Sequence, residues 1–207
     1  MSSKEKADTD KPEYTSTDLQ TNTPIKMKIL CIGDSNTYGY DPRSYIGSRY
    51  PEGLPWTDRL DGCDVINCGT NGMTVPRGQS RYAGLIRLND PDLVTIMLGT
   101  NDLCSGLSAG QTAGRMESFL DTIIDAGKPI LLISPPLLQF GEWVMDDEII
   151  EESQDLGNAY RELAERKGCL FADAGEWEIE MTFDGVHFSP EGHAIFAQKM
   201  NEILGQV

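Results

Sequence analysis

The alternation of short apolar runs with amphipathic segments most constrains how this chain can fold. The runs are four to six residues long and mostly aliphatic or β-branched, which is typical of strands buried on both faces of a parallel sheet. They lie at 28–32, 64–67, 93–98, 130–134 and 169–172. Helical spacing predicts helices over 54–60, 77–89, 112–126, 147–167 and 190–204. We therefore expect an α/β protein, a flavodoxin-like three-layer α/β/α sandwich with about five parallel strands.

The first 26 residues differ in composition from the rest. They are rich in Ser, Thr, Asp and Lys and poor in large apolar side chains, so we expect residues 1–26 to form a disordered polar tail or tag. Residues 27–207 suffice for one domain with its own core, and they contain no repeat. The sequence has neither a secretory signal nor a run of about 18 apolar residues, which predicts a cytoplasmic protein without membrane insertion.

The net charge and the cysteines limit which partners and which redox compartment we expect. The formal net charge is −16, whereas nucleic acid and anionic membranes attract basic surfaces, so we expect no nucleic-acid partner. The five cysteines contain no Cys-x-x-Cys pair, which favours unpaired thiols in a reducing compartment over disulfides. No set of residues has metal-ligand spacing, and we expect neither a metal nor a cofactor.

Polar residues gather where the predicted strands end. "GDSN" (33–36) follows the first run, "CGTNGMT" (68–74) the second and "GTND" (99–102) the third, while "DGVH" (184–187) lies beyond the fifth. The carboxyl ends of parallel strands meet at one edge of an open sheet, and ligands bind there. These blocks therefore predict a polar site at that edge.

The residue types in these blocks suit acyl transfer. A serine such as Ser35 becomes nucleophilic when a neighbouring base takes its proton. His187 is the candidate base, and Asp184, three residues before it, would hold its tautomer. The Ser35 backbone N–H, a glycine N–H from 68–74 and the Asn101 side chain would bind the oxyanion.

Each block also has an ordinary structural explanation. Asn-Asp and Asp-Gly pairs are common in turns, and a lone histidine is often structural, as we interpret His193. A metal-dependent hydrolase is the alternative enzyme. A flavodoxin-like binding module or a phosphoacceptor regulator is the alternative outside enzymes, although no lysine follows Phe171 until Lys199, where the regulator needs one. The joint appearance of the blocks in strand order favours catalysis.

Together the four blocks resemble those of the SGNH hydrolase superfamily, the GDSL esterases and lipases. The resemblance covers residues 27–207 and implies a three-layer α/β/α fold. It also implies that Ser35 is the nucleophile, that Asn101 is an oxyanion donor, and that Asp184 and His187 complete the triad.

The resemblance is less direct at two positions. The family's spacing in the second block, with Asn67 and Thr74 in register, selects Gly72 as the oxyanion glycine, and Gly69 competes with it. Asn36 stands where the family more often has leucine, which should change local packing rather than the reaction.

Three longer stretches, "GDSNTYGYDP", "RYPEGLPW" and "IMLGTND", look more like the bacterial arylesterase and acyltransferase branch. That branch implies a small acyl ester substrate and transfer of the acyl group to water or to an alcohol. A carbohydrate acetyl esterase and a lysophospholipase remain alternatives within the superfamily.

Aromatic residues near the predicted edge are candidates for a substrate pocket, namely Tyr38, Trp56 and Trp143, with Tyr40 and Phe140 close by. The long segment 134–147 suits either a lid or a contact between copies of the chain in a homo-oligomer.

Overall fold

The structure is a computed structural model that describes residues 26–44, 46–76 and 81–206. Apart from Lys26, the predicted tail lies outside the described residues, as does the first part, 77–80, of the predicted helix 77–89.

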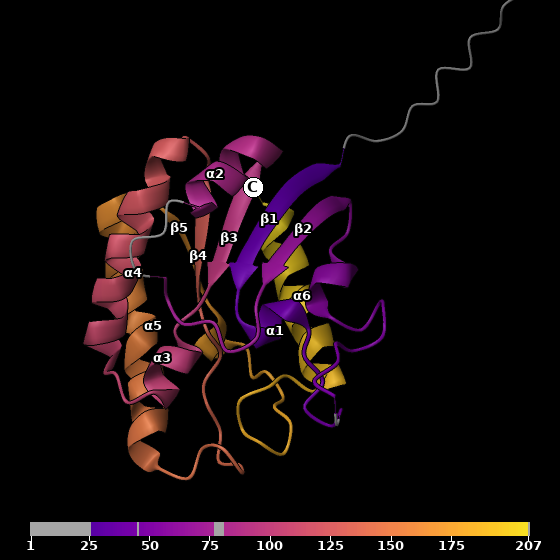
Figure 1. Cartoon of the computed structure of the whole chain (residues 1–207), viewed down its shortest axis with the longest axis vertical. Coiled ribbons are helices and arrows are strands. Elements are labelled where there is room, and N and C mark those ends of the chain that lie inside the picture. Colours follow the sequence, from indigo (N-terminus) through magenta and orange to yellow (C-terminus); the bar gives the residue numbers. More distant parts are fainter. Residues whose placement is uncertain (1–25, 45, 77–80, 207) are drawn as a thin grey trace, which may run out of the picture.

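Within the described residues, five parallel strands form one sheet in the order β2-β1-β3-β4-β5 (Figure 1). The strands are β1 (Met27–Gly33), β2 (Cys63–Gly69), β3 (Leu93–Met97), β4 (Ile130–Ser134) and β5 (Leu170–Asp173). The chain order reverses beside β1, where Gly33 pairs with Gly69 on one side and with Met97 on the other. The prediction of five parallel strands is confirmed, with strand ends within two residues of those expected.

Six α-helices are described: α1 (Ser35–Tyr38), α2 (Arg81–Asn89), α3 (Thr100–Cys104), α4 (Ala109–Ile123), α5 (Asp147–Lys167) and α6 (Pro190–Leu204). The predicted helices 147–167 and 190–204 are confirmed. Helix α4 begins three residues earlier than predicted because Ser108 and Gln111 form a reciprocal capping box in front of it.

The sequence failed where helical segments are short. The helix predicted over 54–60 is wrong, since Trp56–Arg59 forms only a 3₁₀ turn, η1, and Leu60 returns to an extended conformation. Helices α1 and α3 were not predicted because four or five residues are too few to show a hydrophobic period. Two further 3₁₀ turns, η2 (Ile124–Ala126) and η3 (Ala174–Glu176), follow α4 and β5.

The sheet is covered on both faces because successive residues of a strand point to opposite sides. Leu30 and Ile32 of β1 pack into one core with residues of α2, α4 and α5. Ile29 and Cys31 pack into the other core with η1 and α6. The three-layer α/β/α prediction is confirmed, and helices flank the sheet in Figure 1.

The carboxyl edge of the sheet carries α1 and α3, toward which the strand arrows point in Figure 1. Two glycines allow α1 to sit directly on the strand ends. A Cβ on Gly33 would lie 2.0 Å from Thr37 Oγ1, and one on Gly69 would lie 2.2 Å from the backbone nitrogen of Tyr38. Side chains there would displace the turn that holds Ser35.

No helix in residues 26–44, 46–76 or 81–206 combines the length and apolar character that crossing a membrane requires.

Candidate active site

Ser35 is the first residue of α1, immediately after β1. Asp34 caps this short helix, and its carboxylate accepts a hydrogen bond of 3.0 Å from the backbone N–H of Asn36. Asp34 is only 1% exposed, and burial raises its pKa to about 6 although the bond from Asn36 opposes the shift. Asp34 therefore shapes the turn that presents the Ser35 hydroxyl at the sheet edge.

The structure brings the three residues of the predicted triad into one hydrogen-bonded row. His187 Nε2 lies 3.0 Å from Ser35 Oγ, and His187 Nδ1 lies 2.7 Å from Asp184 Oδ2. Ser35 and His187 are each 4% exposed, and Asp184 is fully buried. These distances permit a proton to pass between the serine and the imidazole.

Asp184 is fixed by its own loop. Its Oδ1 accepts hydrogen bonds of 2.9 Å from the backbone N–H groups of Val186 and His187. Burial by itself would raise the pKa of Asp184, but the bonds from the side chain and backbone of His187 and from Val186 outweigh it, so the pKa lies below its usual value. The carboxylate beside His187 is thus held in its charged form.

Asn36 holds the loop that carries His187, a role that sequence analysis missed. Its Nδ2 donates to the Val186 carbonyl and its Oδ1 accepts from the Phe188 N–H, each at 3.0 Å. The amide therefore bridges the two residues that flank His187. The departure from leucine at position 36 was the signal in the sequence that could have indicated it.

A second clamp comes from the loop after β4. The Gln139 N–H donates to the Gly185 carbonyl at 3.0 Å, and the Trp143 N–H donates to the Asp184 carbonyl at 3.1 Å. Between them, a Cβ on Gly141 would lie 2.3 Å from the Asp184 carbonyl carbon. This backbone contact requires glycine at position 141, and the sequence patterns did not indicate it.

The predicted oxyanion donors lie on adjoining turns. Asn101, in α3, donates through Nδ2 to the Met73 carbonyl at 3.1 Å, which ties it to the turn of Gly72 and leaves its second amide hydrogen available. Gly72 has φ of +70° and its N–H has no acceptor among the described residues. The Gly69 N–H, by contrast, donates to Asn67 Oδ1 at 2.9 Å. This difference favours Gly72 over Gly69 as the donor.

A partly buried ion pair supports the same turn. Asp102, which is fully buried in α3, accepts from the Val75 N–H at 2.8 Å and from Arg115 Nη1 at 2.6 Å. The segment that carries Gly72 is therefore anchored at Met73 by Asn101 and at Val75 by Asp102.

The predicted pocket residues divide between the site and the core. The ring of Trp143 lies 5.1 Å from that of His187 and is edge-on to it, and the ring of Tyr40 lies 4.8 Å away. Trp143 is 58% exposed, and Tyr38 is half-buried in α1. The prediction for Trp56 is wrong: it is 1% exposed and packs against α6, because η1 turns its ring into the core.

The described residues contain no group of three or more His, Cys, Asp or Glu side chains placed to hold a metal ion. All five cysteines there are unpaired thiols, from buried Cys31 to exposed Cys104.

A parallel sheet between two helical layers, with this polar edge, is the architecture of an α/β/α hydrolase. Residues 31–195 match the model of the GDSL-like Lipase/Acylhydrolase family, and the chain belongs to that family, within the SGNH hydrolase superfamily.

Individual relatives agree with this assignment. An arylesterase from Vibrio mimicus is 32% identical over 117 residues, which cover 56% of this chain and 58% of that protein. The match therefore spans little more than half of that relative's length.

Among solved structures, a putative arylesterase from Agrobacterium tumefaciens str. C58 is 27% identical with a TM-score of 0.76, covering 87% of this chain and 99% of that one. A carbohydrate acetylesterase family member from Sinorhizobium meliloti is 25% identical with a TM-score of 0.75, and the match covers 87% of this chain and 98% of that one. The predicted superfamily and its arylesterase branch are confirmed.

Proposed function

We propose that this protein is a serine esterase that removes small acyl groups from esters through a covalent intermediate on Ser35. The observation that carries the proposal is the row of hydrogen bonds, 3.0 Å from Ser35 Oγ to His187 Nε2 and 2.7 Å from His187 Nδ1 to Asp184. Family membership and the arylesterase relatives support the same chemistry.

In the first half of the reaction, His187 takes the Ser35 proton as the hydroxyl oxygen attacks the ester carbonyl. The Ser35 and Gly72 N–H groups and the Asn101 amide stabilise the negative charge that develops on the carbonyl oxygen. His187 then gives its proton to the departing alcohol, and the acyl group remains on Ser35. Asp184 stabilises the imidazolium between these two transfers.

In the second half, His187 takes a proton from water or from a second alcohol, which attacks the acyl-enzyme. The acid or the new ester leaves, and the proton returns to Ser35. The two acceptors are told apart by adding a primary alcohol to the assay and measuring how product divides between free acid and new ester.

Ser35→Ala tests the proposal directly. We expect the kcat for p-nitrophenyl acetate to fall by several orders of magnitude, on the order of 10⁶ if the triad acts as a unit. The circular dichroism spectrum should be unchanged, because the substitution removes only one small hydroxyl group. Near-normal turnover by this variant would contradict the mechanism.

The substrate class has two candidates. A short acyl ester of an aryl or simple alcohol is supported by the arylesterase relatives and by the amino-acid sequence after β1 and β2, which contains no long apolar insertion. An acetylated carbohydrate is favoured by the similarity to the Sinorhizobium meliloti protein. A series of p-nitrophenyl esters of rising chain length, run beside acetylated xylan, separates the candidates, and a strong preference for long chains would exclude both.

A further inference from the structure

A polar hollow of about 510 Å³ adjoins the proposed oxyanion turn. Gly72 lies on its wall, together with the hydroxyl residues Thr70 and Thr74 and the side chains of Arg81 and Arg115. A part of the substrate that extended past Gly72 into this hollow would therefore lie near the guanidinium groups of Arg81 and Arg115.

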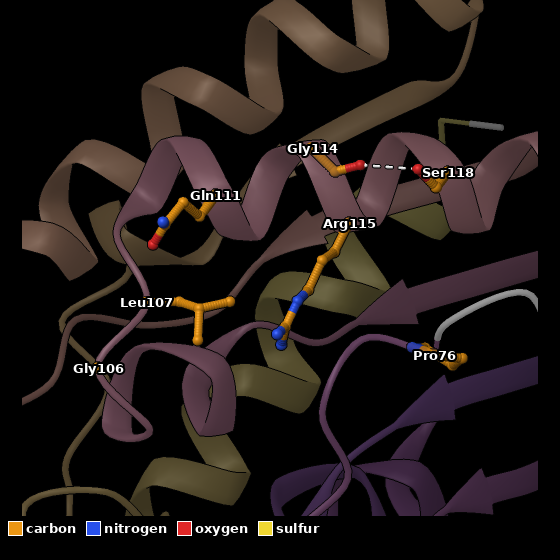
Figure 2. A pocket seen from close by; sticks show the side chains of 7 residues that line it. All are labelled: Pro76, Gly106, Leu107, Gln111, Gly114, Arg115 and Ser118. Atoms are coloured by element: carbon orange, nitrogen blue, oxygen red, sulfur yellow. Dashed lines mark hydrogen bonds between the residues drawn. The ribbon is translucent and has the colours of Figure 1, made fainter.

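The hollow continues beneath α4. An adjoining space of about 720 Å³ shares Pro76 and Arg115 with it and is otherwise lined by α4 and the segment before it. Figure 2 shows the Arg115 side chain extending from α4 into this space, between Leu107 and Pro76. Arg115 thus stands where the two spaces meet, and together they form one groove.

Arg115 is held in place by a single carboxylate. Its Nη1 donates to Asp102 Oδ1 at 2.6 Å, and its side chain keeps 22% of its surface exposed. A guanidinium has five N–H donors, and the other four have no acceptor among the described residues. Asp102 balances the charge of Arg115, so Arg115 offers oriented donors more than net charge.

Arg81 supplies the uncompensated positive charge. Its Nη2 donates to the Tyr82 hydroxyl at 2.7 Å, and its guanidinium lies 4.7 Å from the centre of the Tyr82 ring. No carboxylate among the described residues pairs with it. The tyrosine therefore orients this cation without neutralising it.

The two arginines lie on the surface of a strongly acidic protein. The chain has a formal net charge of −16, yet no Asp or Glu lies among the described residues that line the hollow beside Gly72. Acidic side chains do not line the groove itself: among the described residues, Asp146, Glu148 and Glu152 line a third hollow, which adjoins the far end of the groove at Gly106, Leu107 and Gln111. An anionic group entering the groove is thus favoured beside Arg81 and disfavoured at the far end.

We propose that this groove is a substrate subsite that recognises a carboxylate on the non-reacting part of the ester. The inference rests on the proposed esterase function. Arg81 attracts the carboxylate, while the remaining donors of Arg115 and the hydroxyls of Thr70 and Thr74 complete its hydrogen bonds. The carboxylate can belong to the acyl part, as in a half-ester of a dicarboxylic acid, or to the alcohol part, as in an acylated hydroxy acid or acidic sugar.

The experiment compares charged and neutral esters of matched shape. In the acyl arm, p-nitrophenyl succinate is paired with its methyl ester; in the alcohol arm, 4-acetoxybenzoate is paired with methyl 4-acetoxybenzoate. The quantity measured is the charged-to-neutral ratio of kcat/KM, in the wild type and in Arg81→Gln. Comparing the ratio between proteins cancels the intrinsic reactivity of each ester. We expect Arg81→Gln to lower it by about tenfold or more in one arm, which identifies the part that carries the carboxylate.

Arg87→Gln is the matched control, because Arg87 is an exposed arginine on the same helix and does not line the groove. The control should keep the wild-type ratio. An equal fall in both variants would assign the effect to the overall field of the protein and overturn the subsite, as would an unchanged ratio in Arg81→Gln in both arms. Full hydrolysis of the neutral esters by Ser35→Ala would instead overturn the proposed function, and the subsite with it.

Discussion

The two histidines of this chain lie six residues apart in sequence and are almost equally buried, yet their surroundings differ completely. His187, in the loop after η3, is 4% exposed, and His193, in α6, is fully buried. Burial therefore does not distinguish a reacting imidazole from a structural one.

The partners of the two rings make the difference. His187 has the Ser35 hydroxyl on one nitrogen and the Asp184 carboxylate on the other. His193 accepts at Nδ1 a hydrogen bond of 3.3 Å from the backbone N–H of Trp56, and its buried Nε2 has no partner among the described residues. The rings of Tyr50 and Phe188 pack against it at 5.4 and 5.2 Å.

Protonation follows from these partners. Burial lowers the pKa of His193 to about 3, with Arg59 and Arg49 adding to the shift, so the ring stays neutral in the folded protein. At His187, the adjacent carboxylate of Asp184 is available to stabilise an imidazolium. The structural interpretation of His193 from the sequence agrees with these contacts.

The largest expected effect separates the two rings by function. His187→Ala should lower kcat for p-nitrophenyl acetate on the order of 10⁶-fold, because Ser35 loses its base. His193→Gln should change kcat by less than about tenfold, but it should lower the free energy of unfolding by about 1–3 kcal/mol because the bond from Trp56 is weakened or lost. The measurements are steady-state kinetics and urea unfolding of both variants. A severe loss of kcat in folded His193→Gln would remove the distinction.

The second prediction concerns how His187 is positioned. Asn36→Leu removes the amide that bridges Val186 and Phe188, and we expect kcat to fall about 10- to 100-fold while Ser35 and His187 are both retained. Kinetics are measured at a temperature where the variant is fully folded by circular dichroism.

Asn201→Leu is the control for that experiment. Asn201 makes the same kind of bridge, donating to the Arg59 carbonyl and accepting from the Asp61 N–H, each at 3.0 Å, near the start of β1 and thus at the opposite edge of the sheet. The Asn201→Leu variant should have a lower free energy of unfolding and an unchanged kcat. Equal losses of kcat in the two variants would show that Asn36 acts only through stability.

The smallest effect is a pH dependence of stability. Because the folded pKa of His193 is about 3 and the ordinary value is 6.5, the unfolded chain binds a proton between these values that the native protein does not. Acidification through this window should therefore lower the free energy of unfolding, by up to about 1.4 kcal/mol per pH unit from this group. Asp34 acts in the opposite direction, since its raised pKa of about 6 lets the native state bind the extra proton between 3.8 and 6.

Urea unfolding of the wild type and His193→Gln from pH 7 to 4.5 isolates the contribution of His193. The difference between the two free energies should shrink as the pH falls, since the variant lacks the destabilising group. Parallel curves would show that His193 does not titrate in this way.

The sequence patterns predicted the strands and the long helices well and the short helices poorly. The predicted bounds of helix 147–167 agree with the structure to the residue, and there Asp146 caps α5 and Gly168 ends it in a left-handed conformation. Helices α1 and α3 carry Ser35 and Asn101 but are too short to leave a period. Their positions are set by contact with the strand ends, at glycines such as Gly33.

Side-chain placement was predictable only where the family's motifs specify it. Trp56 and Trp143 are the same residue type in comparable loops, but one lies in the core against α6 and the other is 58% exposed beside His187. No local pattern encodes these two positions, because they depend on elements distant in sequence. The preference for Gly72 over Gly69 differs, since the family's spacing already favoured it and the N–H of Gly69 donates to Asn67, only two residues away.

The amino-acid sequence by itself determined the layered α/β architecture, since the period of apolar residues is a local property that each strand and helix expresses independently. It also supplied the hydroxyl, imidazole, carboxylate and amide groups in strand order. Only the tertiary structure decided that Ser35 and His187, separated by 152 positions, lie 3.0 Å apart. It alone directed His193 into the core and placed Arg81 beside Gly72, because such contacts follow from the packing of whole elements against one sheet.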